Sequence, residues 1–344
     1  MLSMMTEEEQ NYLYQFAKDH YVGEGAIVDL GCWLGASTIA LAKGLQKSDR
    51  TDLRNSKIHS FDLFKWDVSM NMFLNDTSLQ FASDESFLEE YLKQIEPWKD
   101  QVQVYEGDLR DFPWQGGAIE FLFIDAMKSW ELTTSIIRQY FGSLIPGRSI
   151  VYHQDYSFFG AFWIHLSMYR LRDYFEPIYD VPKAWGYVFR LKTSIPDYLL
   201  SATYALEEYS LTEIEQAFED AYRLVSLEKK SQIVGAKILV LMTLNETERA
   251  RLELKKAIAN QLSIADLQVP LGLSFPFLIM QHCMHRIITS ETQLHQNYQY
   301  FQTELAQASQ EIQALNAKIS AMESSKFWQL RKQWFKLKRK MSLN

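Results

Sequence analysis

The sequence AIVDLGCWLGAST, residues 26–38, decides the fold of this chain. A short apolar run ends at Leu30, and Gly31 and Gly35 follow it before an alanine- and leucine-rich segment begins at Ser37. This order predicts a strand, a tight turn that glycine permits, and a helix. A ligand could approach the backbone closely at both glycines, and the first turn of the helix would offer free N–H groups.

Outward from this stretch, short apolar runs alternate with helical patterns. Thr6 and Glu9 have the spacing of a capping box, which predicts a first helix beginning there. The pattern predicts strands over 26–30, 58–61, 102–105, 121–124, 149–152, 175–180 and 186–191, and helices over 37–45, 85–94 and 132–141. The last two strands are close enough to pair antiparallel at one edge. Buried strands separated by helices predict a Rossmann-like α/β fold over residues 1–194, doubly wound around a mostly parallel seven-stranded sheet.

The character of the sequence changes after residue 194. Helical periodicity in short pieces predicts an α-helical domain over 195–288, for which packing or dimerisation is the simplest role. Apolar residues in steps of four and three predict a coiled coil over 289–323 and hence a homo-oligomer; a single amphipathic helix is the alternative. Residues 324–344 mix basic and aromatic side chains, typical of a helix on an anionic membrane surface or of a solvated basic end.

Charge and composition exclude several classes of protein. The chain has 35 basic and 43 acidic residues, and seven of the basic ones lie in the tail, so the body is acidic and we expect no nucleic-acid partner. Cys32 and Cys283 lie far apart and form no metal-ligand spacing, which indicates reduced thiols. We find neither a secretory signal pattern nor an apolar run of about 20 residues, so we expect a cytoplasmic protein, peripheral to a membrane if the tail binds one.

The glycine motif separates two classes of cofactor site. A nicotinamide or flavin site would prefer a third glycine, placed for a pyrophosphate on the helix N-terminus. The spacing found here, Asp29-x-Gly31-x-x-x-Gly35, resembles motif I of the class I S-adenosylmethionine (SAM)-dependent methyltransferases. The resemblance implies that Asp29, Gly31, Gly35 and Ser37 contact SAM.

Acidic residues follow three further predicted strands. In an open α/β sheet, ligands bind outside the carboxyl ends of the strands, so these side chains should meet in one crevice. The resemblance implies that Asp62 accepts the ribose hydroxyls, that Asp108 suits the adenine amino group, and that Asp125 lies in the same crevice. We therefore expect these acids to complete the cofactor site.

Two segments indicate the reaction. FLFIDAMKSWE, residues 121–131, resembles catechol and caffeoyl-coenzyme A O-methyltransferases, which implies that Asp125 binds Mg²⁺ and Lys128 deprotonates a hydroxyl. VYHQDY, residues 151–156, adds Gln154 and Asp155 as metal ligands, with Gln154 standing where an Asp is usual. The same segment resembles the Asp-Asp-Tyr of macrolide-sugar O-methyltransferases. His153 is the second candidate base.

These features predict O-methylation of a saccharide or other small hydroxylated acceptor. The aromatic segments near residues 63–73 and 158–163 are candidate lids for flat rings, or parts of the core. The predicted coiled coil and tail resemble extensions on bacterial enzymes of surface-polysaccharide assembly, and this resemblance implies a reaction in surface-glycan biosynthesis. The alternative is an inactive Rossmann-like scaffold that recruits partners through its helical domain and coiled coil; a nicotinamide-dependent reductase is a distant third.

Overall fold

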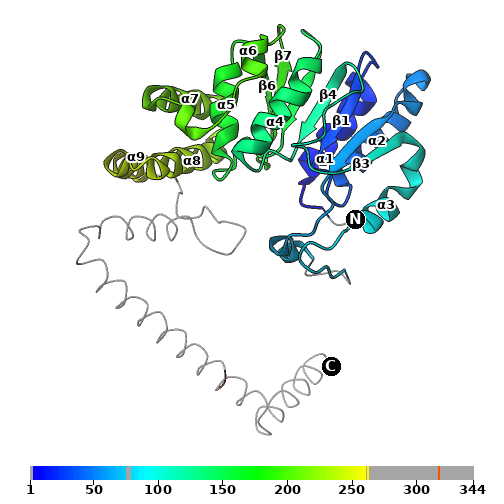
Figure 1. Cartoon of the computed structure of the whole chain (residues 1–344), viewed down its shortest axis with the longest axis horizontal. Helices are drawn as coiled ribbons and strands as arrows, with labels where there is room; N and C mark the ends of the chain where they lie inside the picture. Colours follow the sequence, from blue (N-terminus) through cyan, green and yellow to red (C-terminus); the bar gives the residue numbers. More distant parts are fainter. Residues whose placement is uncertain (1–2, 75–78, 261, 263–316, 318–344) are drawn as a thin grey trace, which may run out of the picture. The chain divides into compact units, whose positions relative to one another are not determined.

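The computed structural model describes residues 3–74, 79–260, 262 and 317 (Figure 1). The end of the predicted helical domain, the predicted coiled coil apart from Ala317, the basic tail and Cys283 lie outside the described residues. The domain boundaries at 194, 288 and 323 therefore stay predictions.

A seven-stranded sheet forms the centre of the fold, in the order β3-β2-β1-β4-β5-β7-β6. The strands are β1 (Ala26–Leu30), β2 (Ile58–Asp62), β3 (Val102–Glu106), β4 (Ile119–Ile124), β5 (Ile150–His153), β6 (Phe175–Asp180) and β7 (Tyr187–Leu191). β1 to β5 pair in parallel, whereas β7 is antiparallel to both β5 and β6. The predicted Rossmann-like fold and its mostly parallel sheet are confirmed.

Helices cover the sheet on both sides. The helices are α1 (Glu7–Gln15), α2 (Ala36–Gln46), α3 (Leu88–Ile95), α4 (Trp130–Tyr140), α5 (Phe162–Leu171), α6 (Asp197–Leu200), α7 (Leu211–Leu224), α8 (Lys230–Thr243) and α9 (Thr247–Ala259). All six residues of β4 are buried, as a strand covered on both faces requires. One core cluster joins Leu13 of α1 and Leu41 of α2 to Phe121 of β4 and Tyr152 of β5.

The local sequence explains where these helices begin. α1 has the predicted capping box, because the Thr6 side chain accepts the Glu9 N–H and the Glu9 carboxylate accepts the Thr6 N–H. Ser129 and Ser210 cap α4 and α7 in the same side-chain-to-backbone manner. The sequence pattern does not predict the helix α5, because its first turn lies within an aromatic segment that is equally a candidate lid.

The helices after residue 196 pack against the α/β unit. α7 and α8 contact α5, and α9 packs on α8 (Figure 1). Lys229 anchors this group: its buried ammonium pairs with Asp180 and donates to the carbonyls of Val181 and Gly186 at 2.6 and 3.2 Å. A buried lysine needs such partners, so this contact fixes the helices to the β6–β7 hairpin.

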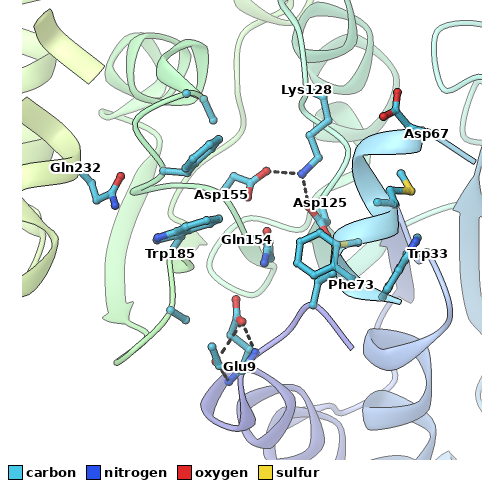
Figure 2. Close-up of a pocket in the computed structure, with 18 of the residues that line it drawn as sticks. Glu9, Trp33, Asp67, Phe73, Asp125, Lys128, Gln154, Asp155, Trp185 and Gln232 are labelled. Carbon is cyan, nitrogen blue, oxygen red and sulfur yellow. Dashed lines mark hydrogen bonds and ion pairs between the residues drawn. The ribbon is translucent and has the colours of Figure 1, made fainter. Parts of the chain in front are cut away.

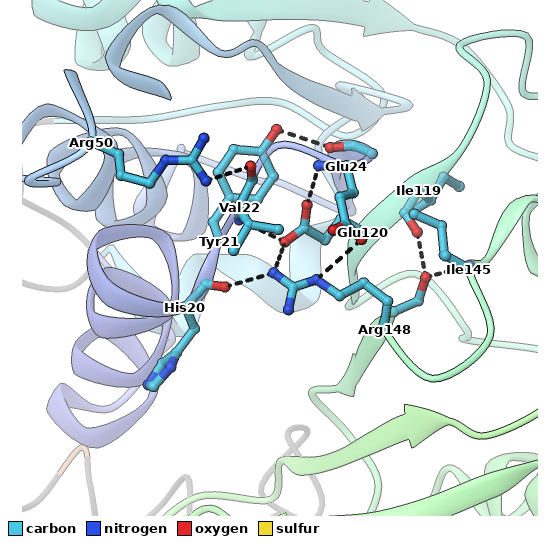
Figure 3. Close-up of polar contacts among 11 residues, drawn as sticks. His20, Tyr21, Val22, Glu24, Arg50, Ile119, Glu120, Ile145 and Arg148 are labelled. Carbon is cyan, nitrogen blue, oxygen red and sulfur yellow. Dashed lines mark hydrogen bonds and ion pairs between the residues drawn. The ribbon is translucent and has the colours of Figure 1, made fainter. Parts of the chain in front are cut away.

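A second buried ionic contact lies at the other end of the sheet, where β4 and β5 begin. The Glu120 carboxylate, at the start of β4, accepts the N–H groups of Val22 and Glu24 and pairs with Arg148 at 2.9 Å (Figure 3). It thereby ties the chain before β1 to the loop before β5. Among the residues that the structure describes, none of the helices combines the length and apolar character needed to span a bilayer.

Candidate functional site

A pocket of about 930 Å³ opens at the carboxyl ends of the central strands. Its wall includes Gly31 after β1, Asp62 at the end of β2, Asp125 after β4 and Asp155 after β5. The sheet order reverses between β1 and β4, so the pocket lies at the switch point where open α/β sheets bind ligands. Glu9 of α1 and Gln232 of α8 complete it from two sides (Figure 2).

The glycine-rich loop turns as predicted. Gly31 has a φ of 85°, and a Cβ there would lie 2.8 Å from the carbonyl oxygen of Asp125. Gly35, with a φ of 91°, is the N-cap of α2 and packs against Tyr91 and Ile95. Only glycine combines these dihedral angles with such close approach, so the loop can lie directly on the end of β4.

The carboxylate of Asp29 contacts the first turn of α2 through two side-chain hydroxyls. Asp29 is fully buried and accepts hydrogen bonds from Ser37 Oγ at 2.9 Å and from Thr38 Oγ1 at 2.6 Å. Burial raises the pKa of Asp29 to about 6. A negative group beside a helix N-terminus is favoured by the helix dipole and repels a second anion, such as a dinucleotide pyrophosphate, at the same helix end.

Asp62 holds two strained residues at the pocket wall. Its carboxylate oxygens accept the N–H of Trp33 at 2.9 Å and the N–H of Phe64 at 2.8 Å. Trp33 and Phe64 have φ angles of 42° and 49°, a left-handed conformation that side chains rarely adopt. Burial raises the pKa of Asp62 above its ordinary value.

Trp33 presents a donor that lacks an acceptor. Its side chain is 7% exposed, and its indole stacks on Trp66 at a centroid distance of 6.1 Å. Within the described part of the chain, Trp33 Nε1 has no hydrogen-bond partner. A buried N–H of this kind is unfavourable unless a ligand or water accepts it, so it indicates an acceptor atom in the occupied pocket.

The floor of the pocket holds an ionic cluster. Lys128 Nζ pairs with Asp125 Oδ1 and with Asp155 Oδ2 (Figure 2). Lys128 is half exposed, and partial desolvation opposes its charge, but the two carboxylates outweigh this effect and hold the pKa of the ammonium above its ordinary value. Burial raises the pKa of Asp125 to about 7 even though Lys128 opposes the shift.

Gln154 completes this cluster as a donor. With its amide nitrogen toward the carboxylates, it donates to Asp155 Oδ1 at 2.7 Å and to Asp125 Oδ1 at 3.1 Å. The predicted Mg²⁺ ligands Asp125, Gln154 and Asp155 thus lie together. Three of the four carboxylate oxygens already accept N–H bonds from Lys128 or Gln154. The described residues contain no group of three His, Cys, Asp or Glu side chains placed to hold a metal. With the Lys128 ammonium between the carboxylates, this donor set does not fit a divalent ion.

Several predicted site residues do not reach the pocket wall. Three of them, Asp29, Gly35 and Ser37, do not line the pocket. Asp108 also lies outside the pocket, where it forms an ion pair with Arg110. His153 is fully buried between aromatic rings, and burial lowers its pKa to about 3. Direct contact of these residues with a cofactor or substrate stays a prediction.

One pocket residue, Glu9, was missed as a site residue, whereas two aromatic lining residues lie in the predicted lid segments. Glu9 faces the pocket because α1 packs on the sheet, where the Tyr152 hydroxyl donates to the Glu9 carboxylate at 3.3 Å. The sequence pattern assigned Glu9 to the capping box alone and did not predict a role in the pocket. Phe158, which stacks on Trp185 at 4.6 Å, and Phe73 form aromatic walls. Phe64 and Trp66 belong instead to the core, so the aromatic segments supply both lining and core.

Comparisons with known proteins give fold likenesses alone. No family model matches the chain, and no curated protein matches it. The chain is similar in structure to CalS11, a calicheamicin methyltransferase, at 15% identity and a TM-score of 0.38, over 53% of this chain and 76% of that one. It is also similar to StiE O-MT residues 961–1257, at 10% identity and a TM-score of 0.31, over 67% of this chain and 68% of that one. A longer StiE O-MT segment, residues 942–1257, gives 11% identity and a TM-score of 0.29, over 74% and 70%. Because identity and TM-score are this low, we infer no function from these likenesses.

Proposed function

We propose that the chain is a SAM-dependent methyltransferase that methylates a hydroxyl group. One observation carries the proposal: the pocket at the switch point combines the Gly31 loop and the Asp62 carboxylate with a buried carboxylate, Asp29, beside the N-terminus of α2. Such a pocket suits a nucleoside cofactor that lacks phosphate and disfavours a dinucleotide.

The residues around the pocket fit the charge and polarity of SAM. The remaining lone pairs of Asp62 can accept ribose hydroxyls, and the Trp33 indole N–H offers a donor to an acceptor atom. Carboxylates outnumber ammonium groups among the lining residues. The six acids are Glu9, Asp62, Asp67, Asp125, Asp155 and Glu228, and the three lysines are Lys128, Lys183 and Lys229. When bound, the cofactor supplies an electrophilic methyl group on a sulfonium cation, a charge that an acidic pocket favours.

A saccharide is the proposed acceptor class. Phe158 and Trp185 form a stacked aromatic wall, and Phe73 faces the pocket from the other side (Figure 2). Flat, partly exposed aromatic faces suit the apolar face of a sugar ring, while the carboxylates can accept its hydroxyl protons. The resemblance of the predicted coiled coil and tail supports a role in surface-glycan biosynthesis.

The proton of the acceptor hydroxyl needs a base in the pocket. Of the two predicted bases, His153 is buried away from the pocket, and Lys128 is held protonated by two carboxylates. We propose Asp125 instead, because it lines the pocket and both Lys128 and Gln154 bond its Oδ1, which leaves Oδ2 to accept the proton. Burial raises the pKa of this carboxyl group, which makes it a stronger base than an exposed carboxylate.

Calorimetric titration with SAM, S-adenosylhomocysteine and NAD, each with and without Mg²⁺, tests the proposal. We expect binding of the two sulfur nucleosides and no binding of NAD, followed by methyl transfer to a sugar hydroxyl in an acceptor screen. Binding without turnover on any acceptor would favour the inactive scaffold. If neither sulfur nucleoside bound, the catalytic assignment would be wrong.

Self-association and membrane contact are separate proposals. We propose that residues 289–323 make the chain a homo-oligomer and that residues 324–344 bring it to an anionic membrane. Sedimentation and vesicle binding of the full chain, compared with chains ending at residues 288 and 323, test them separately. Vesicle binding that survives removal of 324–344 would exclude the tail.

A further inference from the structure

The Asp125–Asp155 pair is surrounded by N–H donors. The two side chains are 18% and 10% exposed. Lys128 contacts one oxygen of each, and the Gln154 amide donates to Oδ1 of both. Three of the four carboxylate oxygens therefore accept a hydrogen bond from a side chain of the same cluster.

Two carboxylates that both stay ionised at this distance need a positive charge between them. In a partly desolvated pocket their mutual repulsion is large, and Glu9 adds a third negative group nearby. A divalent ion is one solution and prefers oxygen ligands. An ammonium ion is another, because it brings one charge and three N–H donors. The two cations would compete for the same oxygens, since like charges at contact distance repel each other.

We propose that Lys128 is the resident cation of this pocket, that its ammonium takes the place of a divalent metal between Asp125 and Asp155, and that the site needs no metal ion. The pairing geometry and the donor orientation of Gln154 carry this inference. Lys128 is then a positioning residue for the carboxylates.

The arrangement also assigns a role toward the acceptor, a step that rests on the proposed function. An ammonium has three N–H bonds, and two of those of Lys128 point to carboxylates. Half of the Lys128 side-chain surface is exposed, so the third N–H can donate to a hydroxyl oxygen in the pocket. Lys128 would hold that oxygen while Asp125 accepts its proton.

Titration of the full chain with Mn²⁺ alone tests the metal inference. We compare the wild type with Lys128→Met, which keeps the aliphatic stem and removes the charge, and with Lys128→Arg, which keeps the charge. Lys99→Met is the matched control, because Lys99 pairs with Glu96 on the exposed surface. We expect Lys128→Met to bind one Mn²⁺ about tenfold or more tightly than the other three proteins, because its carboxylates have lost their cation.

Each alternative result contradicts the inference. Saturable Mn²⁺ binding by the wild type, abolished by Asp155→Asn, would show a true metal site. Equal absence of binding in all four proteins would show that the carboxylate pair is no cation site. If Lys128→Met lost its native circular dichroism spectrum, Lys128→Gln would replace it, since an amide can still donate to one carboxylate. No cofactor or acceptor is present, so failure of the proposed methyl transfer would leave this result unaffected.

Discussion

The backbone N–H of Trp33 donates to the carboxylate of Asp62 at 2.9 Å and joins the glycine-rich loop after β1 to the end of β2. The same carboxylate accepts the N–H of Phe64, and both donors belong to residues with left-handed backbones. A left-handed conformation costs a non-glycine residue about 1–2 kcal/mol. Asp62 therefore stabilises strained backbone as well as facing the pocket.

We predict that Asp62→Ala weakens SAM binding by about tenfold or more and lowers the free energy of unfolding by about 2 kcal/mol. The ligand loses an acceptor for its hydroxyls, and two N–H groups lose theirs. Calorimetry and urea unfolding measure the two effects. Asp62→Asn keeps one carbonyl acceptor and should lose less SAM affinity and less stability. Asp52→Ala is the control, because Asp52 is exposed. Unchanged SAM affinity in Asp62→Ala would argue strongly against the cofactor assignment.

The sequence was sufficient for most of the fold because its elements have sharp local boundaries. β1 matches its predicted bounds, since an apolar run is followed by Gly31, whose φ of 85° ends the strand. β6 also matches. The helix α5 was not predicted, because its first residues are aromatic and their pattern does not indicate which face of a helix would be buried. His165 and Leu166 are both buried there, so the helix has no polar stripe to reveal its period.

The site was harder to predict because it depends on long-range packing. Asp62 and Asp125 follow strands of one parallel sheet, and the alternation of strands and helices placed them together. Glu9 reaches the pocket through contacts 143 residues away in sequence, which no local pattern encodes. The ion pairs of Lys128 depend on side-chain directions that a motif does not specify. A resemblance to metal-dependent enzymes therefore suggested a metal where the structure has an ammonium.

Gly31 gives a second prediction with a matched control. An alanine at Gly31 would meet both a left-handed φ of 85° and the backbone of Asp125, at 2.8 Å from its carbonyl oxygen. Gly117 has nearly the same φ, 83°, and a Cβ added there would have no atom within 4 Å. We expect Gly117→Ala to cost about 1 kcal/mol and Gly31→Ala clearly more, because only Gly31 forces backbone to move. Urea unfolding measures both, and equal losses would mean that the close approach is unimportant.

The buried histidines predict a dependence of stability on pH. Burial lowers the pKa of both His153 and His165 from 6.5 to about 3, so both stay neutral in the folded chain. In the unfolded chain both histidines take up a proton below pH about 6.5. The free energy of unfolding therefore falls as the pH decreases from 6.5 toward 3, because only the unfolded chain gains these protons. Asp29 and Asp125 have the opposite effect on the free energy of unfolding as the pH falls, because burial raises their pKa values and the folded chain takes up these protons first.

A comparison with His165→Phe isolates the histidine effect. The carboxylates are common to both proteins and cancel in the difference. Between pH 7.5 and pH 5, the unfolding free energy of the variant should rise relative to the wild type by about 2 kcal/mol, since phenylalanine takes up no proton when the chain unfolds. Urea unfolding at a series of pH values measures this difference. Parallel pH profiles would show that His165 is already protonated in the folded chain or stays accessible to water.

The Glu120–Arg148 pair gives the last prediction (Figure 3). The Glu120 side chain is 1% exposed and accepts from Arg148 Nη2 at 2.9 Å, while the N–H groups of Val22 and Glu24 donate to it at 2.8 and 2.7 Å. Glu120→Ala leaves the N–H groups of Val22 and Glu24 without their acceptor, and Arg148 Nη2 keeps only the His20 carbonyl, at 3.2 Å. We expect a loss of about 3–5 kcal/mol in the free energy of unfolding, the usual effect of removing one member of a buried pair.

Glu24→Ala is the matched control, because Glu24 contacts the same arginine from the surface. Its side chain is 61% exposed and lies 3.7 Å from Arg148 Nε. An exposed pair contributes about 0–1 kcal/mol, so this variant should unfold almost like the wild type. Similar losses in the two variants would mean that charge alone, and not the buried acceptor for the Val22 and Glu24 N–H groups, holds this end of the sheet. Neither residue lines the pocket, so SAM affinity of the folded variants should match the wild type.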